Sequence, residues 1–220
     1  MRRSLTLIGF VCIFYGYSIG ADYFFQAVED HLYENPANWL PTYPGAEVRT
    51  GDRVVLMENV SFVGYDIVVN GYLEIGMGVS LISGENGLLV SNTGTVDNSG
   101  EILVKYIESS GRIANQIAAR IHLFNFHAFE GAITHNSASA TFVTLLDLEN
   151  QGRFDNYGIC KAGNDFRNHA FFYQIRYANL DVRGNIILSP GSVLTHSPQS
   201  TVVSGKLKKF LISDRLPDEF

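Results

Sequence analysis

A triplet of glycine, any residue and an apolar residue recurs along this chain of 220 residues, and its spacing limits the folds that the chain can adopt. From Gly111 to Gly131 is 20 residues, while Gly131 to Gly152 and Gly184 to Gly205 are 21 residues each. Internal repeats with a period of about 20–50 residues are typical of solenoids and related repeat folds.

The residues around each glycine predict a sharp turn followed by a short strand. Glycine adopts positive φ at no steric cost, so it lets the chain bend. Apolar and polar residues then alternate, as over residues 100–106, which places every second side chain on one face. One repeat cannot bury this face alone, but repeats stacked about 4.8 Å apart share a continuous apolar column. Asn98, Asn115 and Asn156 lie beside such triplets, and we expect them to stack between coils and share side-chain hydrogen bonds.

We therefore predict an all-β fold, a parallel β-solenoid of the right-handed β-helix type. An antiparallel sandwich or jelly roll is the alternative, because its strands also alternate and its turns are also rich in glycine. Residues 51–135 contain no proline and hardly any two-residue hairpin signal except Asn70-Gly71, which favours the solenoid. Gly152→Val is expected to cost more than about 1 kcal/mol, because valine resists positive φ. Structural turns are predicted at Gly94, Gly100, Gly111, Gly131, Gly152, Gly184 and Gly205.

The start of the chain has the layout of a secretory signal peptide. Arg2 and Arg3 are basic, an apolar run of ten residues with a single threonine follows over 5–14, and the small residues Gly20 and Ala21 come after it. The run is short for a membrane span, so a retained anchor is the less favoured alternative. We predict that residues 1–21 are removed and that the protein is secreted or at the cell surface, meeting a membrane only during export.

The rest of the chain is expected to comprise a capping segment over 22–50, the solenoid over 51–210 and a C-terminal tail over 211–220. Residues 22–33 fit either an amphipathic helix or an extended strand that covers the open end of the solenoid. After cleavage Cys160 is the only cysteine, so no intramolecular disulfide can form. Its thiol is then either buried or exposed and reactive.

Composition and motifs exclude several classes of function. Sixteen Lys and Arg against 22 Asp and Glu give a net charge of −6, with no basic stripe to neutralise phosphates, so we expect no nucleic-acid partner. Apolar residues make up 46% and charged residues 17%, which excludes disorder as the main state. The chain has no phosphate loop or dinucleotide fingerprint, so no cofactor is expected.

A Trp motif near the N-terminus carries a resemblance to a known group of proteins. Asn35-Pro36-Ala37-Asn38-Trp39 is followed by Pro44-Gly45 and then by Asp52-Arg53-Val54-Val55-Leu56. This order resembles the entry segment of secreted bacterial β-helix proteins of the Bacteroidota type, which are cell-surface and adhesin-like. The resemblance covers roughly residues 34–156 and implies that Asn38, Trp39, Pro44 and Gly45 cap the first coil.

A polar cluster in the second half is the strongest candidate for chemistry. The interval from Gly152 to Gly184 is 32 residues, longer than its neighbours, so residues 157–177 are interpreted as an insertion that could present a site. Asp165, Arg167 and His169 alternate, and on a strand they would point to one side. With Lys161 and Asp155 they could form a polysaccharide lyase or hydrolase site. The alternative, which we favour, is a solvated loop whose charges neutralise each other.

Other candidate sites are weaker. The spacing of His122, His127 and His135 suits no familiar zinc site, and no calcium-binding loop motif occurs, so no metal is expected. Phe124, Phe126 and Phe129 could form a sugar-stacking platform, but an aromatic stack inside the solenoid is the favoured alternative.

The leading functional hypothesis is an exported, non-catalytic β-helix that acts as a structural or adhesion module, with a polysaccharide or cell-surface glycan as its expected partner. The alternatives are a carbohydrate-active enzyme or a sugar-binding module with its site on residues 157–177. Converging side chains in a groove would indicate an enzyme, whereas exposed rows of Tyr or Phe would indicate sugar binding.

Overall fold

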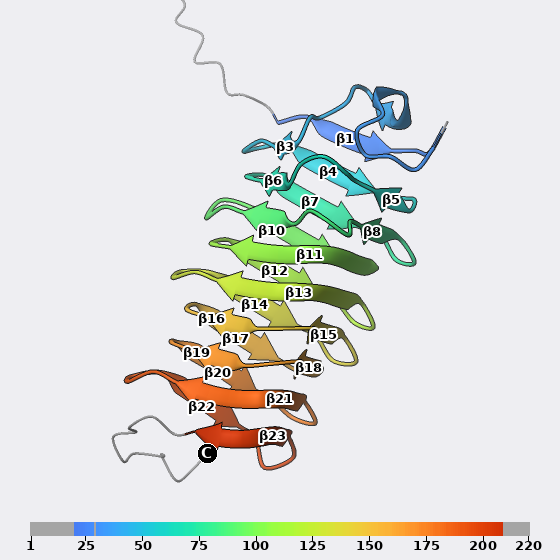
Figure 1. The fold of residues 1–220 in the computed structure, drawn as a ribbon. Coiled ribbons are helices and arrows are strands. Elements are labelled where there is room, and N and C mark those ends of the chain that lie inside the picture. Colours follow the sequence, from blue (N-terminus) through green and yellow to red (C-terminus); the bar gives the residue numbers. More distant parts are fainter. Residues whose placement is uncertain (1–19, 29, 209–220) are drawn as a thin grey trace, which may run out of the picture.

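The computed structural model describes residues 20–28 and 30–208, which form a parallel β-solenoid of about eight turns (Figure 1). Among the described residues every strand pair is parallel except β1 with β2, so the antiparallel alternative is wrong. Most of the predicted signal peptide and the predicted C-terminal tail lie outside the described residues. Within residues 20–28 and 30–208 no helix is both long and apolar enough to cross a membrane.

One side of the solenoid is a sheet of ten strands, here called sheet A. Their order is β2-β1-β4-β7-β10-β12-β14-β17-β20-β22, which from β1 onward follows the chain. The bounds are β1 Asp22–Phe25, β2 Trp39–Leu40, β4 Arg53–Leu56, β7 Tyr72–Ile75, β10 Thr95–Asn98, β12 Arg112–Asn115, β14 Ile133–Asn136, β17 Arg153–Asn156, β20 Phe171–Gln174 and β22 Val193–His196.

The opposite side is a sheet of thirteen strands, here called sheet B, in which long strands bridge pairs of short ones. The first half of β11, for example, pairs with β8 and its second half with β9. The bounds are β3 Glu47–Val48, β5 Val60–Ser61, β6 Ile67–Val69, β8 Ser80–Ile82, β9 Leu88–Val90, β11 Glu101–Ser109, β13 Arg120–Ala128, β15 Thr141–Thr144, β16 Leu148–Asn150, β18 Ile159–Ala162, β19 Phe166–Asn168, β21 Asn179–Leu188 and β23 Thr201–Lys208.

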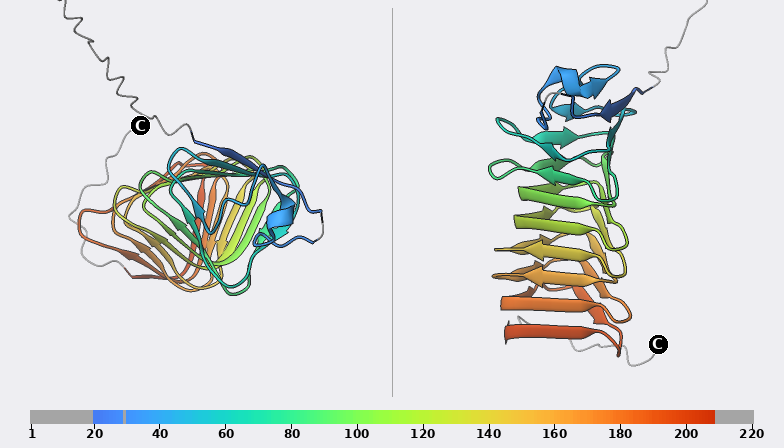
Figure 2. Two further views of the ribbon diagram at one scale, coloured as in Figure 1. Left: turned by 90° about the horizontal axis from the view of Figure 1, so that it is seen from above. Right: turned by 90° about the vertical axis from the view of Figure 1, so that its right-hand side faces the viewer.

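Each coil runs through one strand of sheet A, turns, and returns through sheet B, so the coils enclose one shared interior (Figure 2). The first residues of the sheet A strands are in register from Arg53 to Val193, and successive coils advance by 19, 23, 17, 21, 20, 18 and 22 residues. The glycine spacing near 20 is therefore the length of one coil, with variation absorbed in the turns.

The interior consists of columns in which one residue per coil stacks on its equivalent. One column of sheet A reads Val54, Leu73, Val96, Ile113, Thr134, Phe154 and Phe172, all fully buried. Cys160 belongs to a column of sheet B, between Phe142 and Leu180. Its thiol is free and buried, and burial raises its pKa well above the ordinary value, so it behaves as a core residue.

A ladder of buried amides runs along the end of the sheet A strands. In each step the Nδ2 of one asparagine donates to the side-chain oxygen of the next coil, over 2.7–2.8 Å, and also to a backbone carbonyl. Stacking was predicted for Asn98, Asn115 and Asn156, and the structure extends it. The ladder comprises Asn98, Asn115, Asn136, Asn156 and Gln174.

The glycines at the bends serve two purposes, of which only positive φ was predicted. Gly131 has a φ of +84°, but Gly152 is not among the residues with positive φ. A Cβ on Gly152 would instead lie 2.3 Å from the carbonyl oxygen of Ala132 in the preceding coil. Close approach of stacked backbones therefore requires this glycine. Gly184 and Gly205 lie within β21 and β23, so their assignment to bends is wrong.

The N-terminal segment is aperiodic and aromatic. β1 pairs in parallel with β4, and β2 covers the other edge of β1 in the antiparallel sense, so the extended alternative holds for residues 22–25. Trp39 is 3% exposed, donates from Nε1 to the carbonyl of Tyr33 at 2.7 Å, and packs edge-on against Phe25. Asn38 is fully buried and donates to Asp30, and Gly45 has a φ of +84°.

Candidate functional site

The proposed insertion over residues 157–177 is wrong, because these residues form part of the regular stack. They contain β18, β19 and β20, and the coil steps on either side are 18 and 22 residues. The interval from Gly152 to Gly184 is long only because Gly184 is not the equivalent of Gly152: it lies inside a strand of the opposite sheet.

The five candidate catalytic residues do not converge. Asp155 lies on β17 of sheet A, whereas Lys161 is exposed on β18 of sheet B. Asp165 and Arg167 lie before and within β19, and His169 follows it at the corner leading back to sheet A. Asp165 and Arg167 form an ion pair, whereas Asp155 and Lys161 lie on opposite sheets, so the structure divides the cluster among separate faces.

Arg167 joins two coils through acidic partners. Its Nη1 lies 3.1 Å from Oδ2 of Asp147 and its Nη2 lies 3.2 Å from Oδ2 of Asp165. Asp147 also accepts hydrogen bonds from the Asn164 side chain and the Asp165 backbone. Asp165 in turn accepts from the backbone and side chain of Asn185. This network ties successive coils together through one guanidinium and two carboxylates. The solvated loop of the favoured sequence interpretation is wrong, because Arg167 lies within β19.

His169 belongs to a second group, which sequence reasoning missed. Its Nε2 lies 3.5 Å from Oε1 of Glu149, and its Nδ1 lies 2.6 Å from Oγ of Ser189. Glu149 Oε1 is also 3.6 Å from His127 Nε2 and accepts from Gln151 at 2.9 Å. The contacts join successive coils, since His127 pairs with Glu149 in the β13–β16 register.

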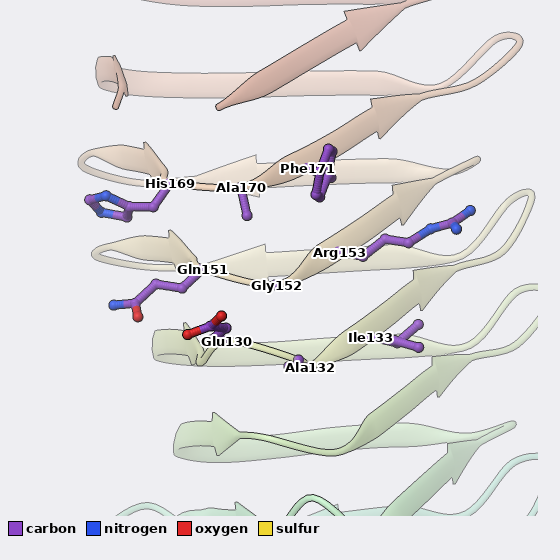
Figure 3. Close-up of a pocket in the computed structure, with 10 residues that line it drawn as sticks. Glu130, Ala132, Ile133, Gln151, Gly152, Arg153, His169, Ala170 and Phe171 are labelled. Atoms are coloured by element: carbon purple, nitrogen blue, oxygen red, sulfur yellow. The ribbon is translucent and has the colours of Figure 1, made fainter. Parts of the chain in front are cut away.

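A shallow trough of about 690 Å³ follows the corner between the two sheets at this level (Figure 3). Its floor consists of the small residues Ala132, Gly152 and Ala170. One wall carries polar side chains and the other carries larger ones, each wall rising over three successive coils. The polar wall is Glu130, Gln151 and His169, and the opposite wall is Ile133, Arg153 and Phe171.

The larger wall continues onto the outer face of sheet A. Arg153 Nε donates to both oxygens of Asp155 at 3.0 Å, and its guanidinium lies 5.3 Å from the ring centre of Tyr173. The rings of Phe171 and Tyr173 are parallel within 4°. Phe171 is 47% exposed and Ile133 42% exposed, so this wall presents apolar surface to solvent. The two hydrogen bonds from Arg153 show that Asp155 neutralises its charge and orients its guanidinium.

The clearest pKa shifts lie away from the trough, on tyrosines of earlier coils. Burial, together with a hydrogen bond to Asp97, raises the pKa of Tyr72 to about 12. A hydrogen bond to Asp66, with burial second, raises the pKa of Tyr106 to about 12. Both tyrosines remain protonated donors between coils at neutral pH, which is a structural role.

The remaining candidates are dispersed. Phe126 is buried inside the solenoid, whereas Phe124 is 45% exposed and Phe129 contacts the ring of His127, so the three share no platform. His135 lies on sheet A beside Tyr157, away from the histidines of β13. Within residues 20–28 and 30–208 no group of three or more His, Cys, Asp or Glu is arranged to hold a metal ion.

The trough could have been found from the sequence by aligning the corners. The order polar, small, large repeats as Glu130-Gly131-Ala132-Ile133, Gln151-Gly152-Arg153 and His169-Ala170-Phe171. This signal becomes visible only when the coil boundaries are known. The chain matches no protein-family profile, and comparisons with curated proteins and with solved structures give no match either.

Proposed function

We propose that the protein is an exported, non-catalytic β-solenoid that acts as a structural or adhesion module outside the cell. The observation that supports this most is the dispersal of the candidate catalytic residues. Glycosidic bond cleavage needs an acid and a base or nucleophile that converge on one bond. Here Asp155 is held by Arg153 on one sheet and Asp165 by Arg167 on the other.

Absence of catalysis is tested by incubating the purified protein with neutral and acidic polysaccharides and measuring reducing ends and unsaturated products. The expected result is no release above that of a heat-denatured sample. Release that disappears in Asp165→Asn or Arg167→Ala would overturn the proposal in favour of a lyase or hydrolase.

Export is supported by the basic, apolar and small-residue order of residues 1–21 and by the resemblance of residues 34–156 to cell-surface β-helix proteins. Expression of the full chain in a Gram-negative bacterium should yield a periplasmic or extracellular product that begins after Gly20 or Ala21. Leu7→Arg interrupts the apolar run and is expected to leave uncleaved protein in the cytoplasm. Cytoplasmic wild-type protein with an intact N-terminus would contradict export.

Residues 22–50 act, in this proposal, as the cap of the solenoid. Two contacts support the role: β2 occupies the edge of β1, and Trp39 packs with Phe25 and Tyr33. An open strand edge invites association with other chains. Trp39→Ala should therefore increase self-association in sedimentation experiments, and a monodisperse variant would argue against capping.

A hydrolase is the second candidate, favoured by one observation. Ser189, His169 and Glu149 form a hydroxyl, imidazole and carboxylate sequence with distances of 2.6 and 3.5 Å. This is the order of groups that activates a serine nucleophile. Glu149 is shared with His127 and Gln151, which favours a structural role. Hydrolysis of acetylated xylan or p-nitrophenyl acetate that is lost in Ser189→Ala would establish the second candidate.

A further inference from the structure

We infer that the corner trough binds an extended, uncharged polysaccharide chain lying parallel to the axis of the solenoid. This inference rests on the proposed adhesion function and names its ligand class. It is carried by the division of the trough into a wall of hydrogen-bonding side chains, a floor of small residues and a wall with exposed apolar surface (Figure 3).

The two walls match the two kinds of surface on a pyranose ring. A sugar ring presents C–H groups on its faces, which pack against aromatic and aliphatic side chains, and hydroxyls around its rim. Phe171 and Ile133 offer the apolar contact, in register with Arg153 between them. Gln151 and Glu130 line the facing wall, and the amide oxygen of Gln151 and the carboxylate of Glu130 offer acceptors to the hydroxyls. His169 completes this wall, with its Nδ1 held by Ser189.

The floor allows a polysaccharide chain to approach the corner of the solenoid closely. Ala132, Gly152 and Ala170 carry at most a methyl group, so no large side chain rises from the base of the trough between its two walls. Stacked coils repeat about every 4.8 Å. This repeat is close to the advance of one residue in an extended polysaccharide with equatorial linkages. Successive sugars would therefore meet corresponding positions of the two walls on successive coils, with Arg153 between the apolar side chains of Ile133 and Phe171.

Charge argues against an acidic ligand. Arg153, the one Lys or Arg side chain lining the trough, is neutralised by Asp155, whereas Glu130 adds a negative charge. The whole chain carries a net charge of −6. Acidic polysaccharides and nucleic acids would meet repulsion without a free cation to compensate it. The strands beside the trough are hydrogen-bonded on both sides, so an extended peptide has no free edge to join.

The side chains of the larger wall are already ordered, which lowers the entropic cost of binding. Arg153 is held between Asp155 and the ring of Tyr173, and Phe171 lies parallel to Tyr173. A ligand would bury the exposed part of Phe171 without having to fix a flexible surface.

Isothermal titration calorimetry with cellohexaose, xylohexaose, mannohexaose and chitohexaose, beside hexagalacturonate as the acidic probe, tests the inference. At least one neutral hexasaccharide should bind, and Phe171→Ala should weaken that binding by about tenfold, the loss of about 1.4 kcal/mol of aromatic contact. Gln151→Ala should also weaken it.

Phe124→Ala is the matched control, because Phe124 is 45% exposed on sheet B, compared with 47% for Phe171. It should leave binding unchanged, and thermal melts should show that all variants remain folded. Equal losses in Phe171→Ala and Phe124→Ala, stronger binding of hexagalacturonate, or no binding of any neutral probe would each overturn the inference. A protein that is exported and inactive yet binds none of the probes would leave the proposed function standing while removing this ligand.

Discussion

The first and second halves of the solenoid share the same coil but bury different kinds of side chain. At the end of the sheet A strands the buried column is Leu56 and Ile75 in the early coils, and becomes amide from Asn98 to Gln174. The early coils bury the aromatic residues Phe25 and Phe62, and the later coils bury a connected group of five phenylalanines. The five are Phe126, Phe142, Phe154, Phe166 and Phe172, with neighbouring ring centroids 4.8–6.1 Å apart.

The difference shows that the hydrogen-bonded backbone, which is the same in both halves, accepts either aliphatic or amide side chains in this buried column. An aliphatic column gains stability from burial alone, at about 25 cal/mol per Å². An amide column gains about 1 kcal/mol per hydrogen bond and also specifies register, because a slipped coil would leave buried donors unpaired. The later coils are therefore expected to be less tolerant of substitution at this column than of variation in turn length.

The largest effect is expected when an amide is placed in the aliphatic half. Leu56 is fully buried and has Phe25 and Ile75 as its neighbours in register, neither of which can hydrogen-bond to an amide. Leu56→Asn loses apolar burial and leaves an unsatisfied polar group, which should cost about 4 kcal/mol in chemical denaturation. Leu56→Met is the control and should cost less than about 1.5 kcal/mol. Similar losses in the two variants would show that burial alone matters here.

The converse change removes an amide from the ladder. Asn136 donates to Asn156 and to the carbonyl of Ile159, and accepts from Asn115. Asn136→Leu removes these three hydrogen bonds from the buried stack and should cost about 3 kcal/mol. Gln174 is the last member of the ladder, so Gln174→Leu should cost about half as much. If both variants unfold at the wild-type denaturant midpoint, the ladder contributes nothing to stability.

Steric exclusion between coils gives the next largest effect. A side chain on Gly152 meets the carbonyl of Ala132 at 2.3 Å, whereas a Cβ on Gly131 meets nothing within 4 Å. Gly152→Val should therefore cost about 2 kcal/mol through overpacking. Gly131→Ala should cost about 1 kcal/mol through its positive φ alone. A smaller loss for Gly152→Val than for Gly131→Ala in thermal unfolding would reverse this assignment.

One substitution should stabilise the stack. Thr134 is fully buried between Ile113 and Phe154, and its Oγ1 has no hydrogen-bond partner in the described part of the chain. Thr134→Val keeps the shape and removes the orphaned hydroxyl, so it should raise stability by about 1 kcal/mol. Thr134→Ser, which keeps the hydroxyl and loses the methyl group, should lower it. A melting temperature that falls in Thr134→Val would indicate a hidden partner for the hydroxyl.

The smallest effect concerns acid and the aperiodic first coil. The backbone N–H of Leu32 and the side chain of Asn38 donate to Asp30 and hold its pKa below the ordinary 3.8. A carboxylate with a lowered folded pKa stabilises the fold above its ordinary pKa, and this contribution disappears as the pH falls through the folded value. The fluorescence of Trp39, the only tryptophan, should therefore change below about pH 4. Asp30→Asn should flatten this acid response, and an unchanged response would assign it to other groups.

The sequence predicts the periodic parts of this protein better than the aperiodic ones. Alternation and glycine spacing repeat in every coil, so the β-solenoid and the stacking of Asn98 on Asn115 were predictable from short-range pattern. Asn136 escaped prediction because two residues, Thr134 and His135, separate it from Ile133 of the triplet that begins at Gly131. This longer spacing obscures the repeat. The supposed insertion arose from treating Gly184 as a bend when it occupies a strand.

The alternation and glycine spacing by themselves determined short strands, turns about 20 residues apart and an apolar interior, because turn and strand propensities are local properties. The parallel pairing of these strands was favoured by the sequence and decided by the structure. The register between coils was decided only by the tertiary structure. That register sends Asp155 and Asp165 to different sheets and brings Gln151, His169 and Phe171 to one corner. The physical reason is that a shift of one residue in a turn moves every later side chain to the opposite face, and no local preference sets turn length that closely.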